Sequence, residues 1–433
     1  MKENILILGL GITGRAVAES LLSKQLSFSA FDDVPSRSLK NWTDKRGIEL
    51  LGINENQNWK NLLDPFSEVV VSPGIPDRHP VFKAALDADI KTVDESDLAD
   101  RWDQRPRCAI TGTNGKTTVV TLVVEMLEKS GIKALPAGNL ETPLVTAIEN
   151  KKAECFVVEA SSFRLAHAEN ISASVAAWLN FSPDHLDHHY DLESYLLAKN
   201  RVWEGVEESV NAIGNSGDPT VSRFMPPDAT SFGSDTSFCA AREGKIFFDE
   251  APIMEIKELP RKMPHDIENA QAAIALAFRF GADLEACVGA LKNFQGLSHR
   301  VEFILRYRGV DFVNDSKSTT PHSTIAALSG LPNAVLIVGG KNKGLDLALL
   351  ANTNPKSVVA IGETAEEFKE IFYNKCVVEV GNTMDEAVFL AFKLANGNGT
   401  VLFSPGCASF DWYDSYLDRG LDFIRAVSEL GNS

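Results

Sequence analysis

The sequence predicts an α/β protein with three domains, and two observations support this fold class. An apolar strand, a glycine-containing turn and a helix follow one another repeatedly along the chain, which is typical of largely parallel sheets. The chain is also 433 residues long, more than one hydrophobic core usually supports. Changes in the pattern divide it into segments 1–98, 99–296 and 297–433.

The composition is that of a globular protein, with 44% hydrophobic and 23% charged residues. We find no apolar run of membrane-spanning length and no leader pattern, so we expect a cytoplasmic protein without membrane insertion. We also expect a monomer. A net charge of −17 argues against nucleic acid as a partner. The six cysteines are expected to be free thiols, with Cys407 in "SPGCASF" a candidate nucleophile.

The first segment begins with the turn "GLGITG", residues 9–14, between an apolar strand and a helix. Its three glycines match the GxGxxG pattern, and Asp32 ends the next strand at the spacing of a ribose-binding acid. A tight turn without a ligand would need the same glycines. Ser72-Pro73-Gly74 follows another strand and is expected to open on the same crevice. This arrangement predicts a Rossmann-like N-terminal domain.

The second segment contains "TGTNGKTT", residues 111–118, between a short apolar strand and a long amphipathic helix. A standard phosphate loop has a glycine where this chain has Ile110. The context still suits a nucleotide: backbone N–H groups cradle phosphates, Lys116 neutralises them and Thr117 ligates Mg²⁺. We therefore predict a central domain of the P-loop ATPase type with a parallel sheet. The predicted phosphate-binding residues are Gly112, Thr113, Asn114, Gly115, Lys116, Thr117 and Thr118.

Two further apolar runs of this segment precede candidate metal ligands, Glu159 and His185. Parallel sheets bind ligands beyond the carboxyl ends of their strands, so these side chains and Thr117 should converge. Oxygen ligands with one imidazole suit Mg²⁺ or Mn²⁺ beside phosphates.

Another interpretation of "HLDHH" is a zinc site formed by His185, Asp187, His188 and His189. We favour the nucleotide-bound metal and expect His188 and His189 at the surface. By position alone Lys199 is a solvated helix lysine, one turn after Tyr195.

The third segment carries the strand patterns "GVDFVNDS", "AVLIVGG", "SVVAIGE", "CVVEVGN" and "TVLFSPG". Their spacing predicts a second Rossmann-like domain at the C-terminus, closed by a charged helix.

Four motifs together resemble the Mur ligases, the ATP-dependent amide ligases of peptidoglycan synthesis: "TGTNGKTT", "NFSPDHLD", "GLSHRVE" and "NDSKST". "EASSFRL", residues 159–165, resembles the signature of the D-glutamate-adding members. The resemblance implies UDP-N-acetylmuramoyl-L-alanine and D-glutamate as substrates, ATP, and two Mg²⁺ ions, with Mn²⁺ as an alternative. It also implies an acyl-phosphate intermediate and the domain order UDP-sugar, ATP, amino acid.

The resemblance assigns roles to individual positions. The implied catalytic residues are Lys116, His185, Lys199 and Lys317, and the implied metal ligands are Thr117, Glu159, His185 and Lys199, the last as a CO₂-derived carbamate. Asn269, Arg300 and Asp315 would join the phosphate loop in binding ATP. The UDP-muramoyl residues would be Gly11, Ile12, Thr13, Asp32, Ser72, Pro73, Gly74, Asn139 and Ser161. Thr319, Lys343, Ser409 and Tyr416 would bind D-glutamate.

Four positions depart from the family pattern, one of them Asp33-Val34, which lacks the polar pair expected beside the uracil. Asp266 stands where the family usually has asparagine, Tyr416 where we expect phenylalanine, and Lys341 competes with Lys343 for one role.

Other functions remain open at this point. One is a different amide ligase of the superfamily, such as folylpolyglutamate synthase, although there the phosphate loop lies near the N-terminus. A nicotinamide oxidoreductase would explain "GLGITG" but not "GKTT". A non-catalytic nucleotide-binding regulator would not need Lys116, Glu159, His185 and Lys199 all intact.

Overall fold

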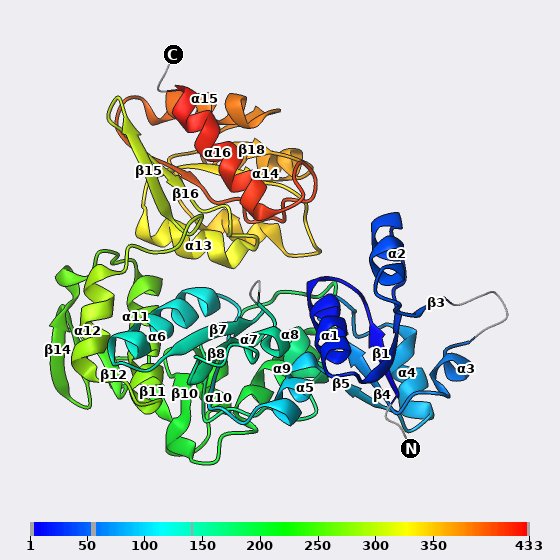
Figure 1. Ribbon diagram of the computed structural model, residues 1–433. Helices are drawn as coiled ribbons and strands as arrows, with labels where there is room; N and C mark the ends of the chain where they lie inside the picture. The colour runs from blue at the N-terminus through cyan, green and yellow to red at the C-terminus, as the bar shows by residue number, and fades with distance from the viewer. Residues whose placement is uncertain (1–3, 53–57, 140–141, 431–433) are drawn as a thin grey trace. The chain divides into compact units, whose positions relative to one another are not determined.

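The structure is a computed structural model that describes residues 4–52, 58–139 and 142–430 (Figure 1). The chain divides into two compact units. Unit 1 comprises Met1–Phe181, Asp187–Leu259 and Glu268–Asn293, and unit 2 comprises Ser182–Leu186, Pro260–Ile267 and Phe294–Ser433. Unit 1 holds the sheets of the first two predicted segments and unit 2 the sheet of the third, while the boundaries near 98 and 296 stay a prediction.

The first sheet of unit 1 has five parallel strands in the order β3-β2-β1-β4-β5. Its central strand buries both faces: Ile5 and Ile7 pack into one apolar cluster and Leu6 and Leu8 into another. The elements are β1 (Asn4–Leu8), α1 (Ile12–Ser23), β2 (Ser27–Phe31), α2 (Arg37–Asp44), β3 (Leu50–Leu51), α3 (Trp59–Leu63), β4 (Glu68–Val71), α4 (Pro80–Asp87), β5 (Lys91–Val93) and α5 (Glu95–Trp102).

The second sheet of unit 1 has nine strands in the order β14-β13-β12-β11-β10-β9-β6-β8-β7. The strands from β7 to β12 pair in parallel, and β13 and β14 complete an antiparallel edge. Its strands are β6 (Arg107–Thr111), β7 (Ala134–Gly138), β8 (Cys155–Glu159), β9 (Val175–Trp178), β10 (Ala212–Asn215), β11 (Thr230–Phe232), β12 (Cys239–Arg242), β13 (Lys245–Phe248) and β14 (Ala251–Glu255).

The helices of this central region begin with α6, which directly follows the phosphate loop. They are α6 (Lys116–Lys129), α7 (Leu144–Ala147), α8 (Ser162–His167), α9 (Leu192–Asn200), α10 (Pro219–Phe224), α11 (Pro264–Arg279) and α12 (Leu284–Asn293), with 3₁₀ turns η1 (Arg201–Trp203), η2 (Ser209–Asn211) and η3 (Ile256–Glu258). Because β9, β6 and β8 are neighbours in the sheet, the loops after these strands open at one edge.

Unit 2 has a six-stranded sheet in the order β15-β16-β20-β17-β18-β19, parallel except for β15. Figure 1 shows α15 and α16 on one face and α13 on the other, and two separate apolar clusters agree with this layering. The strands are β15 (Glu302–Tyr307), β16 (Val310–Asn314), β17 (Val335–Gly339), β18 (Ser357–Ile361), β19 (Val377–Gly381) and β20 (Gly399–Phe403). The helices are α13 (Pro321–Gly330), η4 (Leu347–Asn352), α14 (Ala365–Ile371), α15 (Met384–Ala395) and α16 (Tyr416–Leu430).

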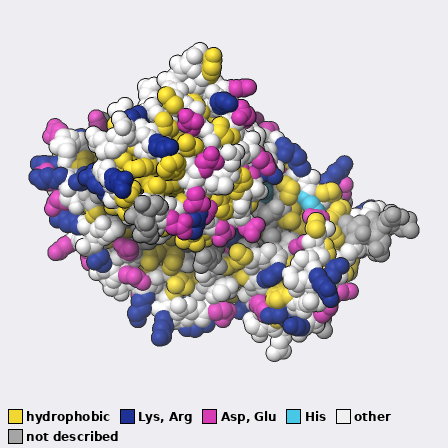
Figure 2. Space-filling view, turned by 90° about the horizontal axis from the view of Figure 1, so that it is seen from above, with side chains coloured by type: hydrophobic (Ala, Val, Ile, Leu, Met, Phe, Trp, Pro, Cys, Tyr) yellow, Lys and Arg dark blue, Asp and Glu magenta, His cyan; other side chains and the backbone are white. Residues whose placement is uncertain are grey.

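The surface charges, the helices and the cysteines show which of the expected features the structure supports. Figure 2 shows acidic and basic side chains interspersed on the visible face. Among the described residues, no helix combines the length and apolarity needed to cross a bilayer. All six cysteines are free, and burial raises the pKa of the Cys407 thiol to about 12. A thiol that stays protonated is a poor nucleophile, so this candidate receives no support.

Candidate active site

The phosphate loop between β6 and α6 folds as an open cradle. Gly115 has φ +86°, a left-handed conformation that favours glycine, and a Cβ there would overlap the Asn269 side chain. Asn269 therefore lies directly against the loop. The Lys116 ammonium group donates to the carbonyl oxygens of Gly112 (2.7 Å) and Thr113 (2.9 Å), so it is held over the cradle. The backbone N–H groups and this cation together suit an anion such as a phosphate chain.

Oxygen ligands meet at the start of α6. The Thr117 hydroxyl donates to Oε2 of Glu159 at 2.7 Å, and the Asn139 amide donates to Oε1 at 3.4 Å. Glu159 ends β8, the strand beside β6, and its side chain is buried. The predicted convergence of Thr117 and Glu159 is thus present in the structure. A hydroxyl and a carboxylate are hard oxygen donors, so this pair fits a Mg²⁺ ion.

Lys199 is buried, with 1% of its surface exposed, and the solvated-lysine interpretation is wrong. It projects from α9 and donates to the same Gly112 carbonyl oxygen at 2.8 Å. Its ammonium nitrogen lies 4.7 Å from the centre of the Tyr195 ring, and the Tyr195 hydroxyl pairs with the Thr113 hydroxyl at 3.0 Å. Lys199 is therefore part of the wall of the phosphate loop.

The first glycine loop is braced by its own chain. Asp32 accepts backbone N–H groups from Leu10 (2.9 Å) and Val34 (3.2 Å), one on each carboxylate oxygen. The Ser72 hydroxyl donates to the Gly9 carbonyl oxygen at 2.7 Å. Asp32 and Ser72, predicted as substrate contacts, thus also shape the turn that places Ile12 in solvent.

Arg164, the arginine of "EASSFRL", is a residue whose role the sequence analysis missed. It is buried and donates to Oε1 of Glu95 at 2.6 Å and to Oδ1 of Asp94 at 3.1 Å. Its other terminal nitrogen donates to the Gly138 carbonyl (3.2 Å) and the Thr13 hydroxyl (3.4 Å). Arg164 therefore links three predicted substrate-contact segments, around Thr13, Asn139 and Ser161.

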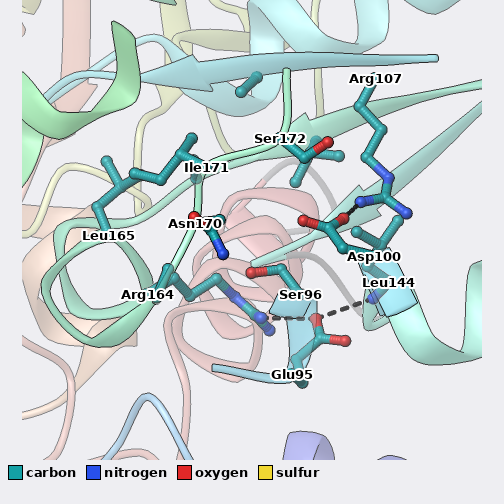
Figure 3. A pocket seen from close by; sticks show the side chains of 14 residues that line it. Glu95, Ser96, Asp100, Arg107, Leu144, Arg164, Leu165, Asn170, Ile171 and Ser172 are labelled. Carbon is teal, nitrogen blue, oxygen red and sulfur yellow. Dashed lines mark hydrogen bonds and ion pairs between the residues drawn. The ribbon is translucent and has the colours of Figure 1, made fainter. Parts of the chain in front are cut away.

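Glu95 completes this network as a fully buried carboxylate (Figure 3). It accepts the backbone N–H groups of Leu144 (2.9 Å) and Val145 (2.8 Å) at the start of α7. Burial raises the pKa of Glu95, and the charge of Arg164 opposes that rise. A pocket of about 40 Å³, lined in part by the exposed residues Asn170 and Ser172, lies beside the network and has room for a few waters but not for a substrate.

The histidines of "HLDHH" are not at the surface as expected. His188 is 8% exposed and His189 is fully buried, because both face Asp77 in the loop before α4. Among the described residues, the only group with metal-ligand spacing is Asp77, His188 and His189. Asp187, part of the zinc interpretation, is exposed and belongs to no such group.

His185 belongs to the short segment Ser182–Leu186 that packs with unit 2. It has φ +56°, and its ring nitrogen Nε2 lies 3.3 Å from Oδ2 of Asp184. A left-handed conformation at a non-glycine residue stores strain, which is common at functional sites. The role of His185 as a metal ligand stays a prediction.

Asp315 is the buried centre of the predicted ATP side of unit 2. Its carboxylate accepts the hydroxyl groups of Ser318 (2.6 Å) and Ser404 (2.7 Å) and the N–H of Val301 (3.2 Å). Burial raises the pKa of Asp315 to about 6 despite these bonds. The carboxylate thus holds the Arg300-containing turn against the end of β20.

The predicted D-glutamate residues lie on adjoining loops of unit 2. The Lys341 and Ala408 backbones pair at 2.9 and 3.0 Å, which brings the loops of Lys343 and Ser409 together. Tyr416 begins α16, and the Lys317 ammonium group lies 3.8 Å from the centre of its ring. The structure brings these side chains to one end of the sheet, while Thr319 sits just before α13.

Asp266, the departure near α11, has a structural role. Its carboxylate accepts Nε of Arg261 at 3.1 Å and the N–H of Met263 at 3.3 Å, at the start of the helix. An aspartate at a helix N-terminus is stabilising, which accounts for the residue without invoking the nucleotide.

Family profiles match the chain in the order of its three predicted segments. "Mur ligase MurD-like, N-terminal domain" covers residues 3–94, "Mur ligase middle domain" covers 110–277 and "Mur ligase, glutamate ligase domain" covers 299–407. The chain is 34% identical to a UDP-N-acetylmuramoylalanine–D-glutamate ligase of Exiguobacterium sibiricum, over 99% of this chain and 97% of the relative. It is 35% identical to the enzyme of that name from Aquifex aeolicus, over 88% and 94%.

Solved structures show the same fold at lower sequence similarity. MurF from Acinetobacter baumannii aligns with a TM-score of 0.63 and 18% identity, over 98% of this chain and 91% of that protein. The UDP-N-acetylmuramate–alanine ligase of Thermotoga maritima aligns with a TM-score of 0.59 and 17% identity, over 99% of both chains. The predicted three-domain α/β class is confirmed.

Proposed function

Because the chain belongs to the Mur ligase family, we propose that it is the ATP-dependent ligase that joins D-glutamate to UDP-N-acetylmuramoyl-L-alanine in peptidoglycan precursor synthesis. The observation that carries the proposal is the cluster of Lys116, Thr117, Glu159 and Lys199 around one phosphate loop. This cluster combines cations for phosphates with oxygen donors for Mg²⁺. The full-length similarity to D-glutamate ligases supports the choice of amino acid.

The reaction must give a carboxylate a leaving group. The alanyl carboxylate attacks the γ-phosphorus of ATP, its oxygen bonds to phosphorus, and ADP leaves. The neutral amine of D-glutamate then attacks the acyl carbon and the bond from that carbon to the phosphoryl oxygen breaks. The products are the amide and hydrogen phosphate, which carries that oxygen and the proton lost by the nitrogen. The chain's contribution is to position both groups and to neutralise the transferred phosphate, with Lys116 and Lys317 as the cations.

Metal binding at this site would involve Thr117 and Glu159, whose oxygen atoms already converge. Mg²⁺ bound there would neutralise phosphate charge. His185 and a carbamate on Lys199 are the further ligands that we propose, for two ions in all, with Mn²⁺ as a substitute. Carbamate formation requires the neutral amine of Lys199, since only that form adds CO₂, and the side chain is buried.

The substrates would divide among the three segments. UDP-muramoyl binding would involve the loops of Gly11, Ser72 and Asn139, and ATP binding would add Asn269, Arg300 and Asp315 to the phosphate loop. D-Glutamate carries two carboxylates, so Lys343 with the hydroxyls of Ser409, Thr319 and Tyr416 is a suitable set. Six free thiols suit a reducing cytoplasm, where we propose that the protein acts as a monomer.

Phosphate release tests this function. The purified protein is incubated with ATP, Mg²⁺ and UDP-N-acetylmuramoyl-L-alanine, and D-glutamate is compared with L-glutamate and diaminopimelate. We expect phosphate release with D-glutamate alone. Equal turnover with the other amino acids would contradict the assigned substrate.

A further inference from the structure

A buried polar cluster ties the two sheets of unit 1 together. Asp77 lies between β4 and α4 of the first sheet, whereas His188 and His189 precede α9 of the second. The backbone N–H of Asp77 donates to the His188 carbonyl at 3.1 Å, and Arg78 donates to the Tyr190 carbonyl at 2.7 Å. Backbone and side-chain contacts thus both connect the Asp77 loop to the segment before α9. We call Asp77, His188 and His189 the histidine clamp.

His188 holds the Ser72–Gly74 turn through a single oriented bond. Its ring nitrogen Nε2 lies 3.0 Å from the carbonyl oxygen of Pro73. A carbonyl only accepts, so Nε2 must carry the proton, which fixes the tautomer of the neutral ring. The Phe163 ring packs on the other side, with ring centres 3.9 Å apart. The Pro73 carbonyl is thereby tied to the second sheet, while Ser72 ties the same turn to its own sheet.

His189 holds the other end of the clamp. Its Nδ1 lies 2.9 Å from Oδ2 of Asp77, and its Nε2 lies 2.9 Å from the Ser162 hydroxyl. Although burial opposes the charge, interactions with His167 and His189 hold the pKa of Asp77 well below its usual range. Asp77 is therefore a carboxylate that accepts from Nδ1 of His189, and in the neutral ring Nε2 accepts from the Ser162 hydroxyl.

Two other functions for this cluster fit less well. Serine, histidine and aspartate in this order form hydrolase triads, but Ser162 and His189 are buried and no substrate can reach the hydroxyl. One ligand atom from each clamp residue lies within 4.8 Å of the others, as a metal site requires. However, both nitrogens of His189 and Nε2 of His188 already have partners, so within the clamp only Nδ1 of His188 and Oδ1 of Asp77 have no hydrogen bond. Two protein ligands are fewer than a tetrahedral zinc site uses.

We propose that the histidine clamp is a positioning device for the UDP-muramoyl substrate. It joins the Ser72–Gly74 turn to the start of α8, where Ser162 directly follows the predicted substrate residue Ser161. The clamp thereby sets the spacing between two substrate-contact turns that belong to different sheets. The proposal rests on the proposed function, because that function assigns both turns to the same substrate.

Two substitutions of His188, by glutamine and by asparagine, test the clamp. The side-chain nitrogen of glutamine takes the place of Nε2 and reaches Pro73, whereas the side-chain nitrogen of asparagine takes the place of Nδ1 and does not. We expect His188→Asn to raise the KM for UDP-N-acetylmuramoyl-L-alanine about tenfold, since one buried hydrogen bond is lost. The KM for ATP and for D-glutamate should stay within about twofold, and His188→Gln should stay close to wild type.

Hydrogen exchange provides a readout that needs no substrate. Without ligands, the amides of residues 72–79 should exchange faster in His188→Asn than in wild type and His188→Gln. Equal exchange in all three proteins would overturn the clamp, and a uniform rise of all three KM values would overturn its specific role. If wild type shows no turnover with D-glutamate, the proposed function fails, while the exchange result still decides the clamp.

Discussion

Replacing Arg164 by methionine tests the buried ion network most sharply. The substitution keeps much of the apolar volume but removes the cation that lies 2.6 Å from Glu95 and 3.1 Å from Asp94. Both carboxylates are almost completely buried, so they stay behind without a counter-charge. Breaking a buried pair in this way costs about 3–5 kcal/mol in the free energy of unfolding.

The measurement is urea-induced unfolding followed by tryptophan fluorescence, since five of the six tryptophans lie in unit 1. Arg46→Met is the matched control, because its pair with Glu19 at 2.6 Å is largely exposed and should contribute about 0–1 kcal/mol. Adding Glu95→Gln to Arg164→Met should recover part of the loss. A loss below about 1 kcal/mol for Arg164→Met would refute the reasoning.

Three further predictions concern the loops and the clamp. Gly115→Ala should lower the free energy of unfolding by about 1–2 kcal/mol, because the backbone of Gly115 is left-handed, and urea unfolding measures this loss. The same substitution should raise the KM for ATP, because Asn269 must move, and phosphate-release kinetics measure this rise. Lys199→Met should lower kcat about 100-fold or more in the same kinetic assay with the fold retained in circular dichroism, whereas activity near wild type would contradict its role. Burial lowers the pKa of His188 from 6.5 to about 4, so below pH 6.5 the unfolded chain binds a proton that the folded chain does not. Stability should therefore fall between pH 6.5 and 4, by up to about 3 kcal/mol, and the fall should be smaller in His188→Gln when both are followed by urea unfolding.

The elements that the sequence predicted well are those with a local physical cause. Glycine turns between apolar strands and helices mark parallel sheets, and the strand order places Thr117 beside Glu159. The continuous apolar run in "NILIL" likewise corresponds to a strand buried on both faces.

The residues that the sequence analysis misjudged depend on partners far along the chain. His188 and His189 are buried because Asp77, more than a hundred residues earlier, faces them. The sequence identified Arg164 only as part of the "EASSFRL" signature. Its partners Asp94 and Glu95 are residues typical of a helix N-terminus, so nothing in the sequence pairs them with an arginine. No local sequence pattern predicts such long-range pairs, although the adjacent histidines His188 and His189 indicate a candidate polar cluster.

The acyl-phosphate route is the central claim, and an isotope label tests it most directly. UDP-N-acetylmuramoyl-L-alanine labelled with ¹⁸O in its carboxylate is turned over with ATP and D-glutamate, and the phosphate is examined by mass spectrometry. With both carboxylate oxygens labelled, we expect one labelled oxygen to move to inorganic phosphate for each amide formed, with ADP as the other product. Label that is released as water, or that leaves in AMP, would contradict it.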